Sequence, residues 1–196
     1  LHPSRVVIGS TNKKAADKLA QLHRPLSDRI IVMKPESAQM SKYAANTYLA
    51  TRITFINQVA DLCEKNGADI QEVIAGIGED SRIGDHYWYP GFGYGGSCFP
   101  KDVSELAAYS RAVGESDNLM NKVHDLNQAR TPFLMEKLGK KVGGWKNKKV
   151  AILGLSFKPN TDDTREAPSI AIINHLQQNG AEVTGFDPMA KWRGDS

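Results

Sequence analysis

Residues 91–102 read Gly91-Phe-Gly-Tyr-Gly-Gly-Ser-Cys98-Phe-Pro-Lys-Asp102, and the rest of the chain can be interpreted outward from them. Four glycines within six residues remove side chains, so a bulky ligand can lie against the backbone there. Pro100 suits the first turn of a helix that continues through 103–113. Cys98 would then lie at the start of that helix, where the helix dipole and a nearby ammonium group favour a thiolate. We interpret the stretch as a nucleophile loop, with a glycine turn capped by a buried cysteine as the alternative.

This stretch resembles the active-site signature of the nucleotide-sugar dehydrogenases, the UDP-glucose/GDP-mannose dehydrogenase family. The signature is long and therefore specific, unlike an isolated GxGxxG. Three further matches extend the resemblance over nearly the whole chain, and they are Lys42 to Asn46, Arg82 to Gly84 and Phe157 to Glu166. The resemblance implies an enzyme that uses NAD to oxidise UDP-glucose to UDP-glucuronate, with GDP-mannose or another nucleotide sugar as the alternative substrate.

The composition is that of an ordinary globular protein. The chain has 196 residues, of which 40% are hydrophobic and 24% charged, so it could bury one good core or two small ones. Its net charge of +3 is scattered, which suits an anionic small molecule but predicts neither nucleic acid nor membrane as a partner. No apolar run reaches the roughly 20 residues that span a bilayer, and a cytoplasmic protein is predicted. The five histidines are scattered, so no metal site is expected.

Three domains are predicted, and the fold class is α/β. Residues 1–34 are expected to be the tail of an N-terminal NAD-binding α/β domain, and 35–140 a mostly helical central dimerisation domain with a long spine helix and the active-site loop. Residues 147–196 are expected to begin a Rossmann-like, doubly wound C-terminal domain that binds the nucleotide sugar. Because strand-like runs lie close to both ends of a chain that starts at Leu1, we interpret it as part of a longer protein.

The predicted elements of the first 80 residues follow from periodicity. Strands are expected at 5–9 and 30–33, with a helix over 13–22. The spacing GxGxxG occurs only at Gly91–Gly96, which follows no predicted strand, so most of the dinucleotide pocket is expected to be absent. Apolar residues at three- and four-residue steps predict a helix over 36–66 that Gly67 ends and that joins domains or forms a homodimer interface. A short helix over 69–77 would follow, and Cys63 would be a packed core thiol.

Several residues of this first half are assigned by the resemblance. Lys42 and Asn46 lie four apart on one side of the long helix, and the family's pair faces the reacting sugar carbon. Arg82 would reach across a dimer interface to the neighbouring subunit's substrate, with a surface ion pair as the alternative. An aromatic loop could pack on the substrate or simply on the domain, and it consists of Tyr87, Trp88, Tyr89 and Pro90. Gly91 and Gly95 are also expected to contact substrate.

The second half is predicted to change from helices to a β-loop-α-β unit. Helices are expected over 103–113 and 119–138, with Pro132 as a kink or a boundary, and 139–149 reads as a linker. A strand over 149–155, a helix over 168–178 and a strand over 182–186 would complete the unit. By resemblance, Lys158 contacts substrate, whereas Lys101 and Arg165 face the cofactor; ordinary exposed cations are the alternative.

The chemistry expected of the site is a four-electron oxidation. Cys98 would attack an aldehyde to form a thiohemiacetal, which becomes a thioester that water hydrolyses. Lys42 would stabilise oxyanions, Asn46 would hold water, and Asp102 would act in proton transfer or orient Lys42. As an isolated fragment the chain is predicted to be inactive, and a dimerisation module is the alternative function. A cysteine-dependent acyl transferase would need His86 or His124 as a partner, but no motif places either one.

Overall fold

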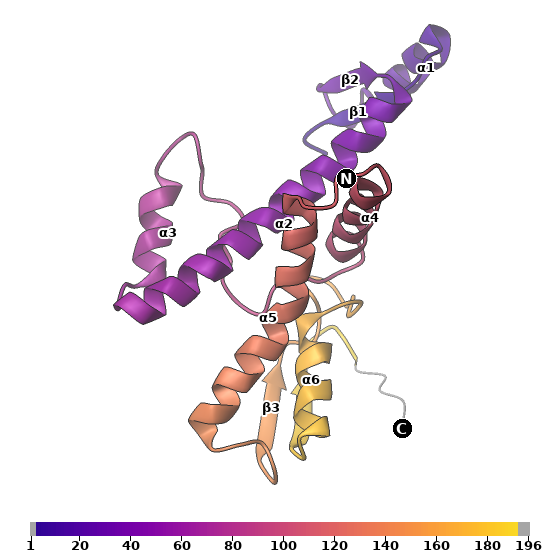
Figure 1. The fold of residues 1–196 in the computed structure, drawn as a ribbon. Helices are drawn as coiled ribbons and strands as arrows, with labels where there is room; N and C mark the ends of the chain where they lie inside the picture. Colours follow the sequence, from indigo (N-terminus) through magenta and orange to yellow (C-terminus); the bar gives the residue numbers. More distant parts are fainter. Residues whose placement is uncertain (1–2, 192–196) are drawn as a thin grey trace. The chain divides into compact units, whose positions relative to one another are not determined.

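The structure is a computed structural model that describes residues 3–191. The chain forms two compact units, Leu1–Asn46 and Thr47–Ser196, and each is described by itself. Figure 1 shows the helices and strands in chain order. As predicted, the fold is α/β and mostly helical, with two small parallel sheets in the described part.

The first unit contains a parallel β-α-β arrangement. Strand β1 (Val6–Gly9) pairs with β2 (Ile30–Met33) in the register Val6↔Ile30, and helix α1 (Lys13–His23) connects them. Gly9 ends β1 at a close approach to the helix that begins at Pro35. A Cβ on Gly9 would lie 2.8 Å from Ala38 Cβ, so a larger residue would not fit there. The predicted strands and helix of this unit are confirmed.

Helix α2 (Pro35–Asn66) is 32 residues long and starts one residue before the predicted position. It ends at Gly67, whose φ of +80° is a left-handed conformation that glycine adopts without strain. The Gly67 and Ala68 amides both donate to the carbonyl of Cys63, which closes the last turn. Cys63 is buried, as predicted.

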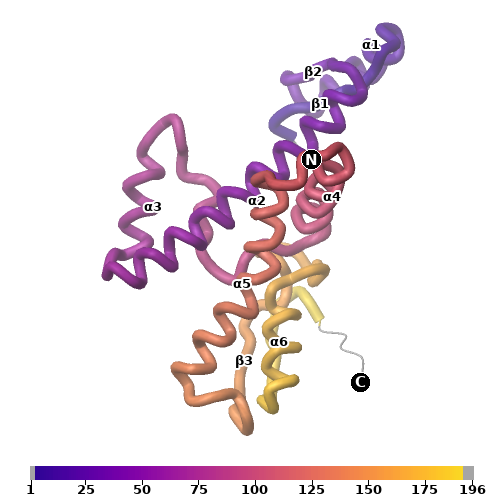
Figure 2. The backbone as a smooth tube through the Cα atoms, in the orientation of Figure 1, coloured from indigo at the N-terminus to yellow at the C-terminus, as the bar shows by residue number. Residues whose placement is uncertain are grey.

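Three more helices complete the helical part of the second unit. They are α3 (Ile70–Gly78), α4 (Phe99–Ala112) and α5 (Leu119–Val142), and α4 packs against α5 (Figure 2). A hydrophobic cluster joins α4 and α5 to α2, and its buried members are Ala50, Ile53, Tyr94, Val103 and Val123. Because Tyr94 belongs to both the glycine-rich stretch and this cluster, that stretch is anchored in the core.

The predicted end of α5 and the predicted linker are wrong. The helix continues through Pro132 and ends at Val142, where Gly143 adopts a φ of +74° as the C-cap. Gly139, the first residue of the predicted linker, lies within the last turns of the helix. A Cβ on Gly139 would be 2.8 Å from Nε1 of Trp145, so the glycine admits the indole ring against the helix. The connection to the next strand is therefore only 143–148.

The remaining elements form the expected β-loop-α-β unit. Strand β3 (Lys149–Leu153) pairs in parallel with β4 (Glu182–Phe186), and helix α6 (Pro168–Gln178) connects them. Ile173 of α6 packs with Leu155 and Ala190, and Ile152 and Val183 of the strands flank this cluster. Within residues 3–191, no helix combines the length and the apolar character needed to cross a membrane.

Candidate active site

Cys98 lies at the N-terminal end of α4, as predicted. It is the N-cap residue, and Pro100 occupies the first turn. The thiol is exposed, with Ser97 Oγ 3.8 Å away, so the alternative of a buried capping cysteine is wrong. A cysteine at a helix start faces the positive end of the helix dipole. The position is therefore suited to a reactive thiol.

The first turn of α4 brings a carboxylate and an ammonium group close to Cys98. The Asp102 amide donates to the Cys98 carbonyl at 2.9 Å, and the Asp102 residue is only 3% exposed. Lys101 Nζ donates to Asp102 Oδ1 at 2.5 Å and lies 3.6 Å from Glu105 Oε2. Lys101 thus forms ion pairs with carboxylates of its own helix, and its expected role toward a cofactor stays a prediction.

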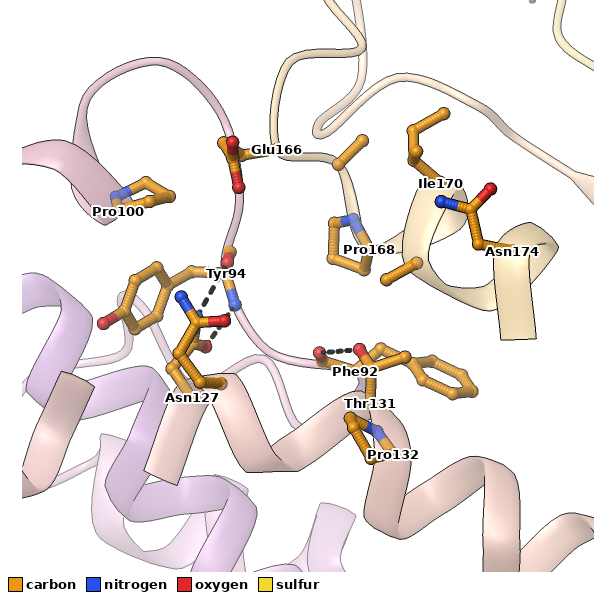
Figure 3. Close-up of a pocket in the computed structure, with 13 residues that line it drawn as sticks. Phe92, Tyr94, Pro100, Asn127, Thr131, Pro132, Glu166, Pro168, Ile170 and Asn174 are labelled. Carbon is orange, nitrogen blue, oxygen red and sulfur yellow. Dashed lines mark hydrogen bonds between the residues drawn. The ribbon is translucent and has the colours of Figure 1, made fainter. Parts of the chain in front are cut away.

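Side chains of α2 and α5 hold the backbone of the glycine loop, by which we mean residues 91–98. Asn57 Oδ1 accepts a hydrogen bond from the Gly91 amide at 2.7 Å. Asn127 accepts from the Tyr94 amide at 2.9 Å and donates to the Tyr94 carbonyl at 3.1 Å, while Thr131 Oγ1 donates to the Phe92 carbonyl at 3.1 Å (Figure 3). Backbone groups that would otherwise be unsatisfied are paired here, which fixes the path of the loop.

A buried ion pair adds to the contacts by which α2 and α5 hold the glycine loop. Arg130 Nε donates to the Gly91 carbonyl at 2.8 Å, and its Nη1 lies 2.6 Å from Asp61 Oδ2. The two side chains are 6% and 20% exposed. One guanidinium group therefore joins α5, α2 and the glycine loop.

Sequence reasoning missed these supporting residues. Asn57 and Asp61 lie four apart on α2, and Asn127, Arg130 and Thr131 have the spacing of one face of α5. Polar residues at helical spacing next to buried apolar positions were the available signal. Their partners are backbone groups of a distant loop, which no local pattern reveals.

On its other side the glycine loop contacts residues 157–167, a segment between β3 and α6 that we call the strap. The Gly96 amide donates to the Arg165 carbonyl at 3.0 Å. A Cβ on Gly95 would lie 2.0 Å from the Glu166 carbonyl oxygen, and one on Gly96 would lie 2.6 Å from the Phe157 ring. The missing side chains of Gly95 and Gly96 are therefore required by the protein itself, which corrects the expectation that they make room for a ligand on that side.

The two predicted cations of the strap lie at its opposite ends. Arg165 binds Asp163 through two hydrogen bonds, of 2.9 Å from Nε and 2.7 Å from Nη2, and these chiefly lower the pKa of Asp163 to about 2. The pKa of Arg165 is raised mainly by the same hydrogen bond, and a smaller contribution comes from the charge of Cys98. Lys158 Nζ lies 5.2 Å from the centre of the Phe157 ring.

Two cavities of the second unit border the strap. One of about 400 Å³ lies between the glycine loop, α5 and α6, and among its lining residues are Phe92, Asn127, Thr131, Pro168 and Asn174 (Figure 3). Another, of about 540 Å³, lies beyond the carboxyl ends of β3 and β4 and is lined in part by Ser156, Lys158 and Asp187. Ligands of parallel α/β sheets bind at the carboxyl ends of the strands, so the second cavity fits the predicted role of Lys158.

Asp187 fixes the start of the strap. Its carboxylate accepts hydrogen bonds from the amides of Leu155, Ser156, Met189 and Ala190, at 2.7–3.1 Å. These amides, that of Ala190 first, hold the pKa of Asp187 well below its usual range. The sequence did not indicate this role.

Side chains of the protein itself contact Arg82 and the aromatic loop (residues 87–90). Arg82 is exposed and binds Asp80, with Nη2 2.6 Å from Oδ2, which is the predicted alternative of a surface ion pair. Trp88 is buried, and the Arg52 guanidinium lies 3.9 Å from the centre of its ring. Arg52 also donates to the carbonyls of Ile83 and Gly84 at 3.0 Å each. Tyr87 and Pro90 are partly buried, and Tyr89 is exposed.

Lys42 and Asn46 belong to the first unit. They line a cavity of about 470 Å³ with residues of β1 and the start of α2, among them Arg5, Val7 and Ser41. The two side chains thus share one cavity, as their spacing predicts, and their placement relative to Cys98 stays a prediction.

The expectation that most of the dinucleotide pocket is absent stays a prediction. The turn after β1 reads Ser10-Thr11-Asn12 and has no glycine to receive a pyrophosphate, and Asn12 itself caps α1 by accepting from the Ala15 amide. Lys101 and Arg165, the residues expected to face the cofactor, both pair with carboxylates. In the described part of the chain, no three His, Cys, Asp or Glu side chains are grouped to hold a metal ion.

A helical domain that presents an exposed cysteine at a helix start, followed by a parallel β-α-β unit, is the arrangement expected of nucleotide-sugar dehydrogenases. The sequence profile of the central domain of the UDP-glucose/GDP-mannose dehydrogenase family matches residues 36–129, and that of its UDP binding domain matches 151–194. The chain therefore belongs to the UDP-glucose/GDP-mannose dehydrogenase family.

Individual relatives cover nearly the whole chain. UDP-glucose 6-dehydrogenase TuaD of Bacillus subtilis is 45% identical over 97% of this chain, and the UDP-glucose 6-dehydrogenase of Pseudomonas aeruginosa is 44% identical over 96%. A UDP-glucose dehydrogenase structure from Pyrobaculum islandicum superposes with a TM-score of 0.92 at 38% identity, covering 96% of this chain and 44% of that one. The chain spans only 41% and 42% of the two curated relatives.

Proposed function

We propose that the complete protein oxidises the primary alcohol of a nucleotide sugar, UDP-glucose, to the carboxylate, with Cys98 as the covalent nucleophile. The observation that carries this proposal is the exposed Cys98 thiol at the start of α4, on a loop whose backbone is held by buried side chains. A nucleophile must be both accessible and accurately placed, and this cysteine has both properties. The chain by itself, which spans 41% and 42% of the two curated relatives, is expected to be inactive in turnover.

The proposed chemistry assigns a covalent step to Cys98. After the alcohol has been oxidised to an aldehyde, the Cys98 thiolate adds to the aldehyde carbon and forms a thiohemiacetal. Loss of a second hydride converts this to a thioester, and water hydrolyses the thioester to release the carboxylate and the thiol. Bound NAD would supply the acceptor for both hydrides.

The other proposed roles follow from charge and position. Lys42 would stabilise the oxyanions that develop at the sugar carbon, and Asn46 would hold the hydrolytic water. Asp102, buried in the first turn of α4, would exchange protons with that water or orient Lys42. Lys158, at the cavity beyond β3 and β4, would bind the substrate phosphates.

The choice of UDP-glucose rests on the relatives. Two proteins that are 44–45% identical to this chain are named UDP-glucose 6-dehydrogenases. A structure at 27% identity, with a TM-score of 0.82, is a UDP-D-ManNAc dehydrogenase from Pyrococcus horikoshii. UDP is common to these names, so UDP-linked sugars are proposed over GDP-mannose. A cytoplasmic location is proposed with them, because the activated sugar is a soluble metabolite.

Alkylation of Cys98 tests this proposal on the 196-residue chain. Iodoacetamide labelling should be slowed several-fold by UDP-glucose and much less by GDP-mannose. Buried Cys63 serves as the internal reference and should label slowly under all conditions. Labelling of Cys98 that no nucleotide sugar changes would refute the proposed site, and stronger protection by GDP-mannose would change the proposed substrate.

We also propose that the protein forms a homodimer through α2. Tyr48, Phe55 and Leu62 are spaced by seven residues, and they are 62%, 53% and 61% exposed. An apolar stripe at this spacing is suited to packing against another helix. Leu62→Arg should therefore shift the sedimenting species toward monomer, whereas Leu22→Arg, at an exposed apolar position of α1, should not. Equal behaviour of the two variants would exclude this interface.

A further inference from the structure

We propose that the strap is a positioning element for Cys98: it docks on Gly95 and Gly96 and thereby holds the Arg165 charge beside the thiol. This inference deepens the proposed function, on which it rests for the role of Cys98 as nucleophile. Phe157 and Arg165 are the positioning residues, since neither is required to touch a substrate for this effect. The contacts lie within the second unit, in which the glycine loop and the strap are described together.

Steric fit is the first observation behind this inference. The main-chain carbonyl of Glu166 occupies the space of a Gly95 side chain, and Pro168 Cδ lies 3.0 Å from the same position. The Phe157 ring occupies the space of a Gly96 side chain in the same way, with three ring atoms at 2.6–3.0 Å from a would-be Cβ. Backbone and ring atoms cannot move aside as the end of a flexible side chain can. Only glycine at both positions allows the strap to lie where it does.

The docked strap places its arginine close to the nucleophile. The Gly96 amide donates to the Arg165 carbonyl, and Cys98 follows Gly96 by two residues. The backbone of Arg165 therefore lies against the loop that carries Cys98. The pKa of Arg165 is raised mainly by its hydrogen bond with Asp163, and a charge on Cys98 adds a smaller contribution in the same direction. Asp163 orients the guanidinium through two hydrogen bonds. Arg165 thus offers a positive charge to anions that approach Cys98, and this charge depends on docking.

Both ends of the strap are tied to the β3–α6–β4 unit. Asp187 binds the amides of Leu155 and Ser156 at one end, and Ser169 Oγ donates to the Leu155 carbonyl at 2.6 Å at the other. Glu166 within the strap has a φ of +51°, which is strained for a residue of this kind, and Asn160 has a φ of +61°, which asparagine adopts more readily. A strained segment with fixed ends keeps one shape only while its docking contacts persist. Docking on the two glycines supplies those contacts.

The test compares alkylation of Cys98 by two reagents of similar size and different charge. Iodoacetate is an anion and iodoacetamide is neutral, so the ratio of their rate constants reports the positive charge beside the thiol. Gly95→Ala should undock the strap and lower this ratio about threefold at low salt, with a smaller change in 1 M salt. Phe157→Ala removes the ring that lies against Gly96, and it should also lower the ratio. Arg165→Met should lower it without undocking.

Hydrogen exchange and a matched glycine variant separate docking from folding. The Gly96 amide should exchange faster in Gly95→Ala and Phe157→Ala, and at the wild-type rate in Gly76→Ala, where a Cβ meets nothing within 4 Å. An unchanged reagent ratio in Arg165→Met, or an unchanged Gly96 exchange rate in folded Gly95→Ala, would overturn the inference. If Gly95→Ala does not fold, Phe157→Ala decides. Neither readout needs a nucleotide sugar, so failure of UDP-glucose to protect Cys98 would refute the proposed function separately.

Discussion

The glycine loop has two supports that differ in kind. On the helix side, Asn57, Asn127, Arg130 and Thr131 hold the loop with hydrogen bonds from mostly buried side chains. On the strap side, the loop is held by steric fit on Gly95 and Gly96 and by one backbone hydrogen bond. The first support belongs to the core of the helical domain, whereas the second comes from the β3–α6–β4 unit.

This difference indicates a division of roles. Buried polar contacts are costly to break, because each lost partner leaves a desolvated group without a hydrogen bond. A partly exposed segment that fits against glycines breaks only one backbone hydrogen bond when it leaves, so its departure costs less. The helix side should therefore determine whether the loop folds, and the strap side should determine the charge around Cys98.

The largest expected effect comes from Arg130→Met. This change leaves the Asp61 carboxylate without its buried partner and frees the Gly91 carbonyl. The free energy of unfolding, measured by urea denaturation, should fall by about 3 kcal/mol. Lys137→Met is the matched control, because Lys137 also joins α5 to α2, through Glu64, but at a more exposed position that does not touch the loop. Its effect should be at most about 1 kcal/mol, and equal losses would contradict the division of roles.

Asn127→Ala should have the next largest effect. It removes both hydrogen bonds to Tyr94, whose backbone groups are then left without these partners. A loss of about 2 kcal/mol in the free energy of unfolding is expected. Asn174→Ala alters an exposed amide at the same cavity, on the side of α6, and should change stability by less than about 0.5 kcal/mol. A destabilisation by Asn174→Ala as large as that by Asn127→Ala would show that the cavity, not the loop, is the sensitive feature.

A smaller, pH-dependent effect is expected at Asp187, which anchors the strap. Its pKa is lowered in the folded state, so its contribution to stability is complete above the ordinary pKa of about 3.9 and is lost as the pH falls below that value. The melting temperature of the wild type should therefore drop on acidification from pH 5 to pH 3 more than that of Asp187→Asn. Identical slopes for the two proteins would argue against this anchor.

The smallest effect on stability is expected from Asp163→Asn. The partner of Asp163 is the largely exposed Arg165 side chain, and exposed ion pairs stabilise proteins little. The melting temperature at pH 7 should stay close to that of Asp162→Asn, its neighbouring exposed control. The iodoacetate-to-iodoacetamide ratio should change in Asp163→Asn only, because only that variant removes the group that orients Arg165. A marked drop in melting temperature would place the pair among the structural supports instead.

Local signals in the sequence predicted the elements well where they were strong. The 32-residue α2, its end at Gly67 and the cap of α3 by Asp69 follow from periodicity and from residues with defined backbone preferences. The start of α4 at Cys98 follows from Pro100. The end of α5 was mispredicted because Gly139 is a packing contact for Trp145, and such a partner cannot be recognised from the residues next to it.

The sequence by itself determined the position of Cys98 at a helix start, the order of the elements and the family, because these depend on local backbone preferences and on a long, specific signature. Only the tertiary structure decided why the glycines are needed and what holds the loop. Gly95 and Gly96 face a segment about 60–70 residues further along the chain, and Gly91 is held by Asn57 and Arg130 from two different helices. Steric fit and hydrogen bonding between distant segments arise only when folding brings them together, so no pattern within either segment could disclose them.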